Sequence, residues 1–250
     1  MTKVCILGAG KVGTHFIKEC INNPAIELIQ IFNRSQKGIQ LYQNSIPTTQ
    51  SVYELKKADL YLVALPDDVI ATLDLNHLKG LVAHTSGTLA FTNLQAQNRA
   101  VLYPLQSFSK EKKIHFKKLP LCLETEFEKD YKILREFAYS LSDAVYAIDA
   151  SKRQKIHLAA VFANNFSNRM MGIAYDLCKE HQIDFEILQP LLQETFLKTQ
   201  ILPPHIAQTG PALRNDQQTI IKHMDQLTGT NKTIYQLITQ SIQEKHGTEL

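Results

Sequence analysis

Three glycines that follow the first apolar run constrain this chain more than any other feature. Residues 3–16 read KVCILGAGKVGTHF, so an apolar strand pattern leads directly into Gly8, Gly10 and Gly13. Apolar residues then recur at helical spacing from 11 to 21, which places the glycines in a strand-to-helix turn. In such a turn the first glycine allows a sharp bend, the second lets a phosphate approach the backbone, and the third lets the helix pack closely on the sheet.

The remainder of the first 150 residues alternates apolar runs with helical stretches. Strands are expected at 3–7, 26–32, 59–65, 81–84, 100–103, 120–124 and 144–148. Strands separated by helices in this way form right-handed units of a parallel sheet. Beyond Ala150 the strand pattern stops, and helical spacing runs from 151 to 181 with further helices up to Gly247. The sequence therefore predicts an α/β chain, with a Rossmann-type, mostly parallel sheet domain at 1–150 and an all-α domain at 151–250.

The glycine turn predicts a binding site for the pyrophosphate of a dinucleotide. The helix that begins at Lys11 has free N–H groups in its first turn, including those of Lys11 and Val12, and the positive end of its dipole lies there. A G-x-G-x-x-G pattern alone is a weak signal. Its position after a strand and at the start of a helix makes it credible here.

The end of the second expected strand, IFNRS, indicates which dinucleotide is bound. An NAD site has a carboxylate about twenty residues beyond the glycines to bind the ribose hydroxyls. Asn33 occupies that position. Asn33 and Ser35 can donate hydrogen bonds to a 2′-phosphate, and Arg34 can stack on adenine and pair with the phosphate. The sequence therefore favours NADP(H) over NAD(H), with an ordinary surface arginine at Arg34 as the alternative.

Two further strand ends belong to the same expected edge of the sheet. In open α/β sheets, ligands bind beyond the carboxyl ends of the strands. The segment LVALPDD places Ala64, Leu65 and Pro66 at that edge, and HTSG places Thr85 and Ser86 there as hydroxyl donors near a nicotinamide. A simple turn after the strand is the alternative for Thr85 and Ser86.

Composition excludes several classes of protein. The four cysteines are far apart and show no metal-ligand spacing, which favours free thiols in a reducing cytoplasm and no metal site. The chain starts without a signal-peptide pattern, and no apolar run approaches the roughly 20 residues that cross a bilayer. A net charge of +3 is too small to indicate nucleic acid. The lysines in the stretch 105–119 indicate a solvated loop or, as the alternative, a loop that attracts an anionic ligand.

Seven segments in order resemble one known family. They are ILGAGKVG, FNRS, VALPDD, HTSG, YPLQSF, HLAAVFANNF and TGPALRND, and together they span the chain. The sequence resembles bacterial NADP-dependent oxidoreductases with a Rossmann-like domain followed by a DUF2520 domain. That family is similar to pyrroline-5-carboxylate reductase, to F420-dependent NADP reductase and, more distantly, to the β-hydroxyacid dehydrogenases. The resemblance implies a helical domain like the C-terminal domain of 6-phosphogluconate dehydrogenase, an active cleft between the domains, and a homodimer.

One departure from the β-hydroxyacid dehydrogenases affects the expected chemistry. Their catalytic lysine stands three residues before a pair of asparagines, whereas here Val161 precedes the pair Asn164 and Asn165. Valine cannot exchange a proton, so that acid–base chemistry does not carry over. The missing lysine argues against alcohol oxidation more than against imine reduction.

Other residues are candidates for the missing group. His157 lies one turn before Val161, and histidine is a residue type suited to proton transfer at neutral pH, although a lone histidine on such a helix is more often structural. Asn165 and Asn164 can orient a ligand, Arg214 can bind a carboxylate or phosphate, and Gln106 lies at a strand end. Further candidates at strand ends are Tyr103 and His84. For Arg214, capping a helix or pairing with Asp216 is an equal alternative.

Two hypotheses follow. The first is an NADP(H)-dependent oxidoreductase that transfers hydride to or from a small anionic imine, keto acid or hydroxy acid. The second is an NADP(H)-binding sensor or regulatory protein that has kept the fold and lost catalysis. A nucleic-acid partner is not expected, because the lysine-rich stretch lacks interleaved aromatic residues and a broad basic face.

Overall fold

The computed structural model describes residues 1–109 and 112–247, and divides the chain into two compact units. Unit 1 is Met1–Asn165 and unit 2 is Phe166–Leu250. The division falls later than the boundary expected near 150. The first helix after that boundary hydrogen-bonds to the sheet unit through Arg153 and Gln154, a pairing that the change from strand to helix pattern could not reveal.

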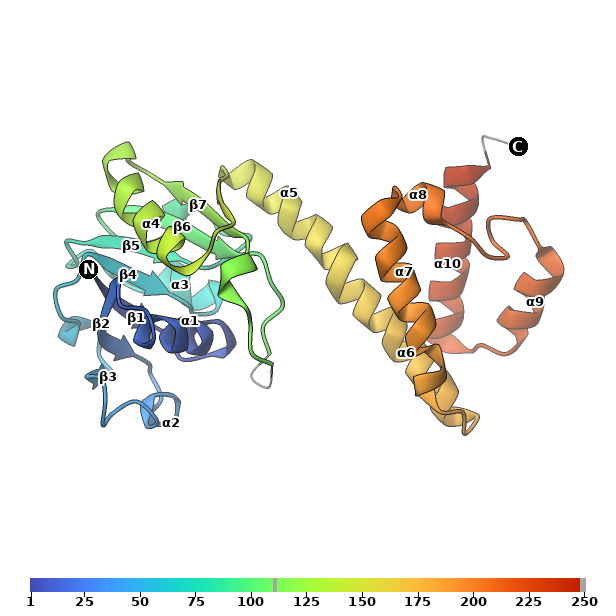
Figure 1. The fold of residues 1–250 in the computed structure, drawn as a ribbon, viewed down its shortest axis with the longest axis horizontal. Coiled ribbons are helices and arrows are strands. Elements are labelled where there is room, and N and C mark those ends of the chain that lie inside the picture. Colours follow the sequence, from blue (N-terminus) through green and yellow to red (C-terminus); the bar gives the residue numbers. More distant parts are fainter. Residues whose placement is uncertain (110–111, 248–250) are drawn as a thin grey trace. The chain divides into compact units, whose positions relative to one another are not determined.

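A single eight-stranded sheet forms the centre of unit 1 (Figure 1). Its strand order is β3-β2-β1-β4-β5-β6-β7-β8, and all neighbours are parallel except β6 and β7. The first six positions have the strand order of a Rossmann sheet, which confirms the expected fold class. The strands are β1 Thr2–Leu7, β2 Ile26–Phe32, β3 Thr48–Thr49, β4 Leu60–Val63, β5 Leu81–His84, β6 Arg99–Pro104, β7 Leu121–Thr125 and β8 Val145–Ala147.

Helices cover both faces of this sheet because successive strand residues alternate between two apolar clusters. On one face Val4 and Ile6 pack with Phe16 of α1 and Phe137 of α4. On the other face the neighbouring strand residues pack with Ile70 of α3. The helices of this unit are α1 Lys11–Ile21, α2 Gln36–Ile39, α3 Asp67–Thr72, α4 Glu128–Leu141 and α5 Ala150–Ala160, with short 3₁₀ turns at Val52–Glu54, Phe91–Asn93 and Phe116–Lys118.

A π-helical segment, Val161–Phe166, continues the chain from α5 to α6, so the expected helix over 151–181 is present with a wider turn in it. Such wide turns occur often at functional sites. This one contains Val161, Asn164 and Asn165, the residues of the motif compared above with the dehydrogenases.

Unit 2 is helical throughout its described part, as expected for this region. Its helices are α6 Ser167–Glu180, a 3₁₀ turn Phe185–Leu188, α7 Gln189–Ile201, α8 Pro204–Ala207, α9 Gln217–Asp225 and α10 Gly229–His246. Many of its large apolar side chains are exposed, among them Leu191, Phe196, Leu197 and Ile201 of α7. Apolar surface of this extent on helices is typical of a protein interface. Among the described helices of the whole chain, none has the length and apolar character that a bilayer span requires.

Candidate functional site

The glycine turn has the shape that a dinucleotide needs. Gly8 has a φ of 108°, a conformation that side chains disfavour, and a Cβ there would lie 2.4 Å from the carbonyl oxygen of Ala64. A Cβ on Gly13 would lie 1.8 Å from the carbonyl oxygen of Gly8, so α1 begins in direct contact with the turn. Gly10 is different, because a Cβ there would meet no atom within 4 Å.

The open space beside Gly10 lies at the start of α1, and no side chain caps this end of the helix. The N–H groups of the first helical turn, at Lys11, Val12 and Gly13, have no carbonyl partner within the helix. A pyrophosphate can therefore reach the backbone beside Gly10 and accept from these donors. The residues present thus fit an NADP cofactor at this turn.

Asn33 connects the glycine turn to the end of β2. Its side-chain Oδ1 accepts from the N–H of Ala9 at 3.1 Å, and its Nδ2 donates to the carbonyl oxygen of Ser35 at 2.9 Å. One N–H of Nδ2 is therefore used internally and the second remains for a ligand. Arg34 and Ser35 are exposed beside it. The sequence predicted ligand contacts for Asn33 but not this internal bridge.

The residues at the ends of β4 and β5 make different contacts within unit 1. Ala64 and Leu65 contact the glycine turn, and Pro66 precedes α3 at the surface. The N–H of Thr85 donates to the carbonyl oxygen of Val63 at 3.1 Å. Ala64 and Leu65 thus lie next to the turn that would hold the pyrophosphate, and Thr85 lies beside the end of β4.

Ser86 serves the turn that follows β5. Its hydroxyl donates to Asp67 at 3.0 Å and accepts from the N–H groups of Thr88 and Leu89, both at 3.1 Å. The side chain is buried. These bonds occupy the hydroxyl, which favours the simple-turn alternative raised for this residue.

Tyr103 and His157 form a hydrogen-bonded pair at the same edge of the sheet. The Tyr103 hydroxyl lies 3.0 Å from Nδ1 of His157, and the two rings meet edge to face with centroids 5.9 Å apart. Gly87 allows this contact, because a Cβ there would lie 2.6 Å from His157 Nδ1 and 2.9 Å from the Tyr103 ring. The HTSG segment therefore contributes a glycine that the sequence reading did not single out.

This pair lines a cavity of about 460 Å³, called here the dyad cavity. Gln106, Asn164 and Asn165 also line it. Four residues that the sequence suggested for catalysis or substrate binding, His157, Gln106, Asn164 and Asn165, are thus brought together with Tyr103 within unit 1. Arg214 belongs to unit 2, where it is exposed before α9, and Asp216 rather than Arg214 caps that helix by accepting from the N–H of Thr219 at 3.1 Å.

A buried arginine holds α5 on the sheet and so fixes the place of His157. Arg153 is completely buried, forms an ion pair with Glu124 of β7, and donates to the carbonyl oxygen of Leu89 at 2.5 Å. Gln154 donates to the carbonyl oxygen of Thr88 at 3.0 Å. The sequence reading missed Arg153 because it lies in a polar stretch, SKRQK, that is typical of a solvated helix.

Burial sets the protonation of two groups near this cavity. Desolvation lowers the pKa of His84 from 6.5 to about 4, so its imidazole is neutral at pH 7. It accepts from the Ser86 N–H at Nδ1, which leaves Nε2–H facing the Ala90 carbonyl oxygen at 3.3 Å. Burial also raises the pKa of the Tyr103 phenol, so this hydroxyl keeps its proton. His84 is therefore structural, and Tyr103 is a neutral partner for His157.

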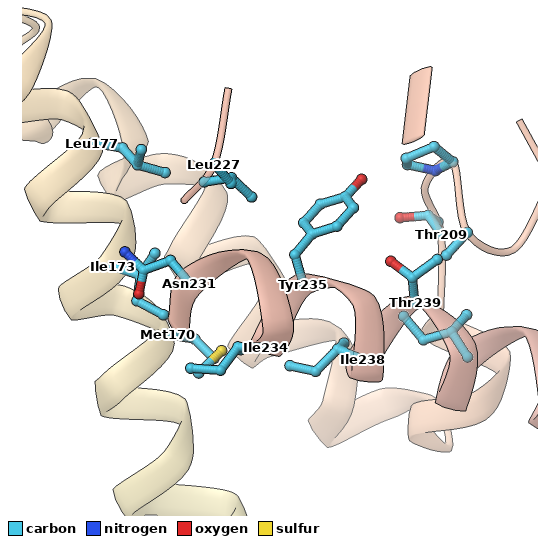
Figure 2. Close-up of a pocket in the computed structure, with 13 residues that line it drawn as sticks. Met170, Ile173, Leu177, Thr209, Leu227, Asn231, Ile234, Tyr235, Ile238 and Thr239 are labelled. Carbon is cyan, nitrogen blue, oxygen red and sulfur yellow. The ribbon is translucent and has the colours of Figure 1, made fainter. Parts of the chain in front are cut away.

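Unit 2 contains a separate hollow of about 360 Å³ between α6 and α10 (Figure 2). Apolar side chains from both helices converge on it, including Ile173 and Leu177 of α6 and Ile234 of α10. Its lining has few polar groups, and the hydroxyl of one of them, Tyr235, is paired with Nδ1 of His223 at 2.9 Å. Unlike the dyad cavity, this hollow has no histidine among its described lining residues. Across the described residues, no three His, Cys, Asp or Glu side chains cluster as metal ligands would.

Comparisons with known proteins show the family and the fold of this chain. Residues 119–242 match the family described as "Domain of unknown function (DUF2520)". A crystal structure from Bacteroides fragilis described as a "putative NADP oxidoreductase" is 32% identical, covers 97% of this chain and 98% of its own, and has a TM-score of 0.88. No curated protein matches the sequence.

Two more distant crystal structures share the fold. The 1-pyrroline-5-carboxylate reductase of Streptococcus pyogenes is 14% identical, with 99% of this chain and 98% of that chain covered and a TM-score of 0.63. The imine reductase of Myxococcus stipitatus, solved with NADP+, is 13% identical, with 98% and 96% covered and a TM-score of 0.63. At these identities the likeness shows the fold alone.

Proposed function

This chain, with its DUF2520 region at residues 119–242, belongs to the family of the Bacteroides fragilis protein described as a "putative NADP oxidoreductase". On that premise we propose that it is an NADP(H)-dependent oxidoreductase for a small anionic substrate. The observation that carries the proposal is the contrast among the three glycines: two are closed against the backbone, and Gly10 alone opens onto free space at a helix start. When bound, the nicotinamide supplies or accepts the hydride.

The residues after β2 would select the phosphorylated cofactor. Arg34 and Ser35 are exposed at the end of this strand, and Asn33 keeps one N–H available beside them. A guanidinium suits a 2′-phosphate because it presents several donors in a planar fork. NADP+ should therefore bind more tightly than NAD+, and Arg34→Ala should weaken NADP+ about tenfold, as loss of a charge-assisted contact does, while NAD+ changes little.

His157 is the proposed proton donor and acceptor, with Tyr103 orienting it. The Tyr103 hydroxyl can donate to Nδ1 of the neutral ring or accept from Nδ1–H of the charged ring, so it holds the imidazole in both states. Among the described residues Nε2 of His157 has no hydrogen-bond partner, and it remains to exchange a proton in the cavity. Asn165, Asn164 and Gln106 would orient the carbonyl or imine group.

The side chains of the dyad cavity fit the reduction of a C=N or C=O bond better than the oxidation of an alcohol by way of a catalytic lysine. Val161 holds the position where the β-hydroxyacid dehydrogenases have their lysine, and it cannot exchange a proton. An imine accepts hydride readily once it is positioned, and one histidine can supply the single proton required. We therefore place imino acids first among the substrates to test, followed by keto and hydroxy acids.

A homodimer is part of the proposal. The exposed apolar side chains of α7 and the hollow between α6 and α10 leave much of unit 2 uncovered in a single chain. A second copy would bury this surface, as obligate interfaces do. Light scattering on purified protein should give twice the 28.4 kDa mass of one chain.

The test of the function is a screen of imino, keto and hydroxy acids that follows NADPH absorbance. Turnover should appear with one of these classes, and His157→Gln should lower kcat by about 10² to 10⁴ while the Kd for NADPH stays within about twofold of wild type. His77→Gln is the matched control, because His77 is exposed and lines neither the dyad cavity nor the glycine turn. Tight NADPH binding without turnover in every class would favour the sensor alternative, and absence of binding would refute both.

A further inference from the structure

The lysine-rich segment after β6 is fixed to the core by three buried side chains. Ile114, Phe116 and Leu119 are buried, and the ring of Phe116 meets Phe16 of α1 edge to face at 5.2 Å. Lys118 lies between these anchors, and Lys112 and Lys113 directly precede Ile114, so the buried side chains fix the backbone that carries all three lysines. Lys112, Lys113 and Lys118 are all exposed.

These three lysines line a second cavity of about 480 Å³, called here the lysine cavity. His115 also lines it, and the described part of its wall contains no carboxylate. Within the described residues Lys112, Lys113 and Lys118 have no carboxylate within 4 Å, whereas their neighbour Lys117 pairs with Asp143 at 3.3 Å and lies outside this cavity. A hollow lined by charges of one sign concentrates the opposite charge.

The segment that leads into the lysine cavity is also fixed. Ser109 lines it, and its carbonyl oxygen lies 2.8 Å from Nε2 of the buried His15 of α1. The ring of His15 also contacts Phe108 with centroids 5.4 Å apart. Two segments that line the cavity, one ending at Ser109 and one around Phe116, are thus attached to the same helix, α1.

The lysine cavity and the dyad cavity share part of their lining. Gln106, Ser107 and Asn164 line both of them. One molecule can therefore reach from the Tyr103–His157 pair to the lysines without leaving the protein surface. None of the residues of the glycine turn lines the described part of the lysine cavity.

We propose that the lysine cavity binds the oxyanion of the substrate, a carboxylate or phosphate group, while the reacting carbon lies in the dyad cavity. Ammonium groups bind both oxyanions as point charges with several donors. The statement that the oxyanion belongs to a substrate rests on the proposed function, but binding of an anion in the cavity can be measured without any turnover.

The experiment titrates the full chain with inorganic phosphate and, separately, with succinate, in saturating NADP+ and at constant ionic strength. NADP+ occupies the glycine turn and prevents the probes from binding there. Backbone amide resonances report where each probe binds, and those of Ser107, Lys118 and Asn164 should shift. A response to phosphate alone or to succinate alone identifies the oxyanion, and either one supports the proposal.

Two charge-matched triple variants separate the site from general attraction. Lys112→Gln with Lys113→Gln and Lys118→Gln should weaken probe binding about fivefold or more, whereas Lys117→Gln with Lys129→Gln and Lys132→Gln should change it less than about twofold. If the first triple variant does not fold, Lys118→Gln against Lys117→Gln gives the same comparison at adjacent positions.

Equal weakening by both variants, or shifts confined to other parts of the chain, would overturn the proposal. Failure of NADP+ to bind would instead refute the proposed function, and the amide shifts would still show whether the lysine cavity binds an anion.

Discussion

Gly10→Ala should weaken cofactor binding and Gly13→Ala should lower stability, although both add one methyl group to the same motif. At Gly10 the added Cβ meets no protein atom within 4 Å, and the residue has an ordinary φ of −77°. Gly10→Ala should therefore fold with a free energy of unfolding within about 1 kcal/mol of wild type, since the reduced freedom of the unfolded chain offsets the poorer helix cap. Its methyl group would occupy the space that the pyrophosphate needs.

At Gly13 the added Cβ would lie 1.8 Å from the Gly8 carbonyl oxygen, which is about half of an ordinary van der Waals separation. The obstacle is backbone rather than a flexible side chain, so α1 must move away from the turn. Overpacking of this kind costs about 3 kcal/mol. For a unit of this size that corresponds to a fall in melting temperature of about 6 to 12 °C.

Calorimetric titration with NADP+ and urea denaturation of both variants test this reasoning. Gly10→Ala should lose NADP+ affinity by about tenfold or more, equivalent to at least 1.4 kcal/mol, at nearly unchanged stability. Gly13→Ala should lose stability first. Wild-type NADP+ affinity in Gly10→Ala would show that the pyrophosphate does not lie beside Gly10, and wild-type stability in Gly13→Ala would refute the close contact between α1 and the turn.

Two further predictions concern buried charge. Arg153→Met should lower the free energy of unfolding by about 3 to 5 kcal/mol, because it leaves the Glu124 carboxylate without its partner. A double variant with Glu124→Gln should recover part of this loss. An unchanged urea midpoint for Arg153→Met would contradict the prediction. Burial lowers the pKa of His84 from 6.5 to about 4, so between pH 6.5 and pH 4 the imidazole takes up a proton in the unfolded chain but not in the folded one. The free energy of unfolding should therefore fall by up to about 3 kcal/mol as the pH drops through this range. The free energy of unfolding, measured by urea denaturation at several pH values, should depend less steeply on pH in His84→Gln than in wild type. An equal dependence on pH in both proteins would exclude His84 as the source.

The sheet and the glycine turn could be predicted because their signals are local. An apolar run, a glycine spacing and a helical stripe each report on neighbours along the chain, and β1, α1 and β2 follow them closely. The two-residue edge strand β3 has no such signal, since Thr48 and Thr49 pair with the end of β2 only after the chain has folded back.

The candidate site was predicted only in part because its contacts connect distant positions. His157, Gln106 and Asn164 could be suggested from residue type and motif, but the contact of Tyr103 with His157 joins β6 to α5 and depends on a missing side chain at Gly87. Arg153 was not suggested because nothing in its neighbours distinguishes a buried arginine from a solvated one. Its partner Glu124 lies on another element and is found only in three dimensions.

The bridge made by Asn33 limits how the cofactor preference of this protein can be redesigned. Exchange of Asn33 for aspartate is the obvious substitution for an enzyme that should accept the unphosphorylated dinucleotide. Here that exchange would keep the acceptor for the Ala9 N–H but place a carboxylate oxygen against the Ser35 carbonyl oxygen, in place of a donor. The resulting repulsion would disturb the turn beside the pyrophosphate, so both cofactors would lose affinity. Arg34 and Ser35, whose side chains take no part in this bridge, are the better positions for engineering.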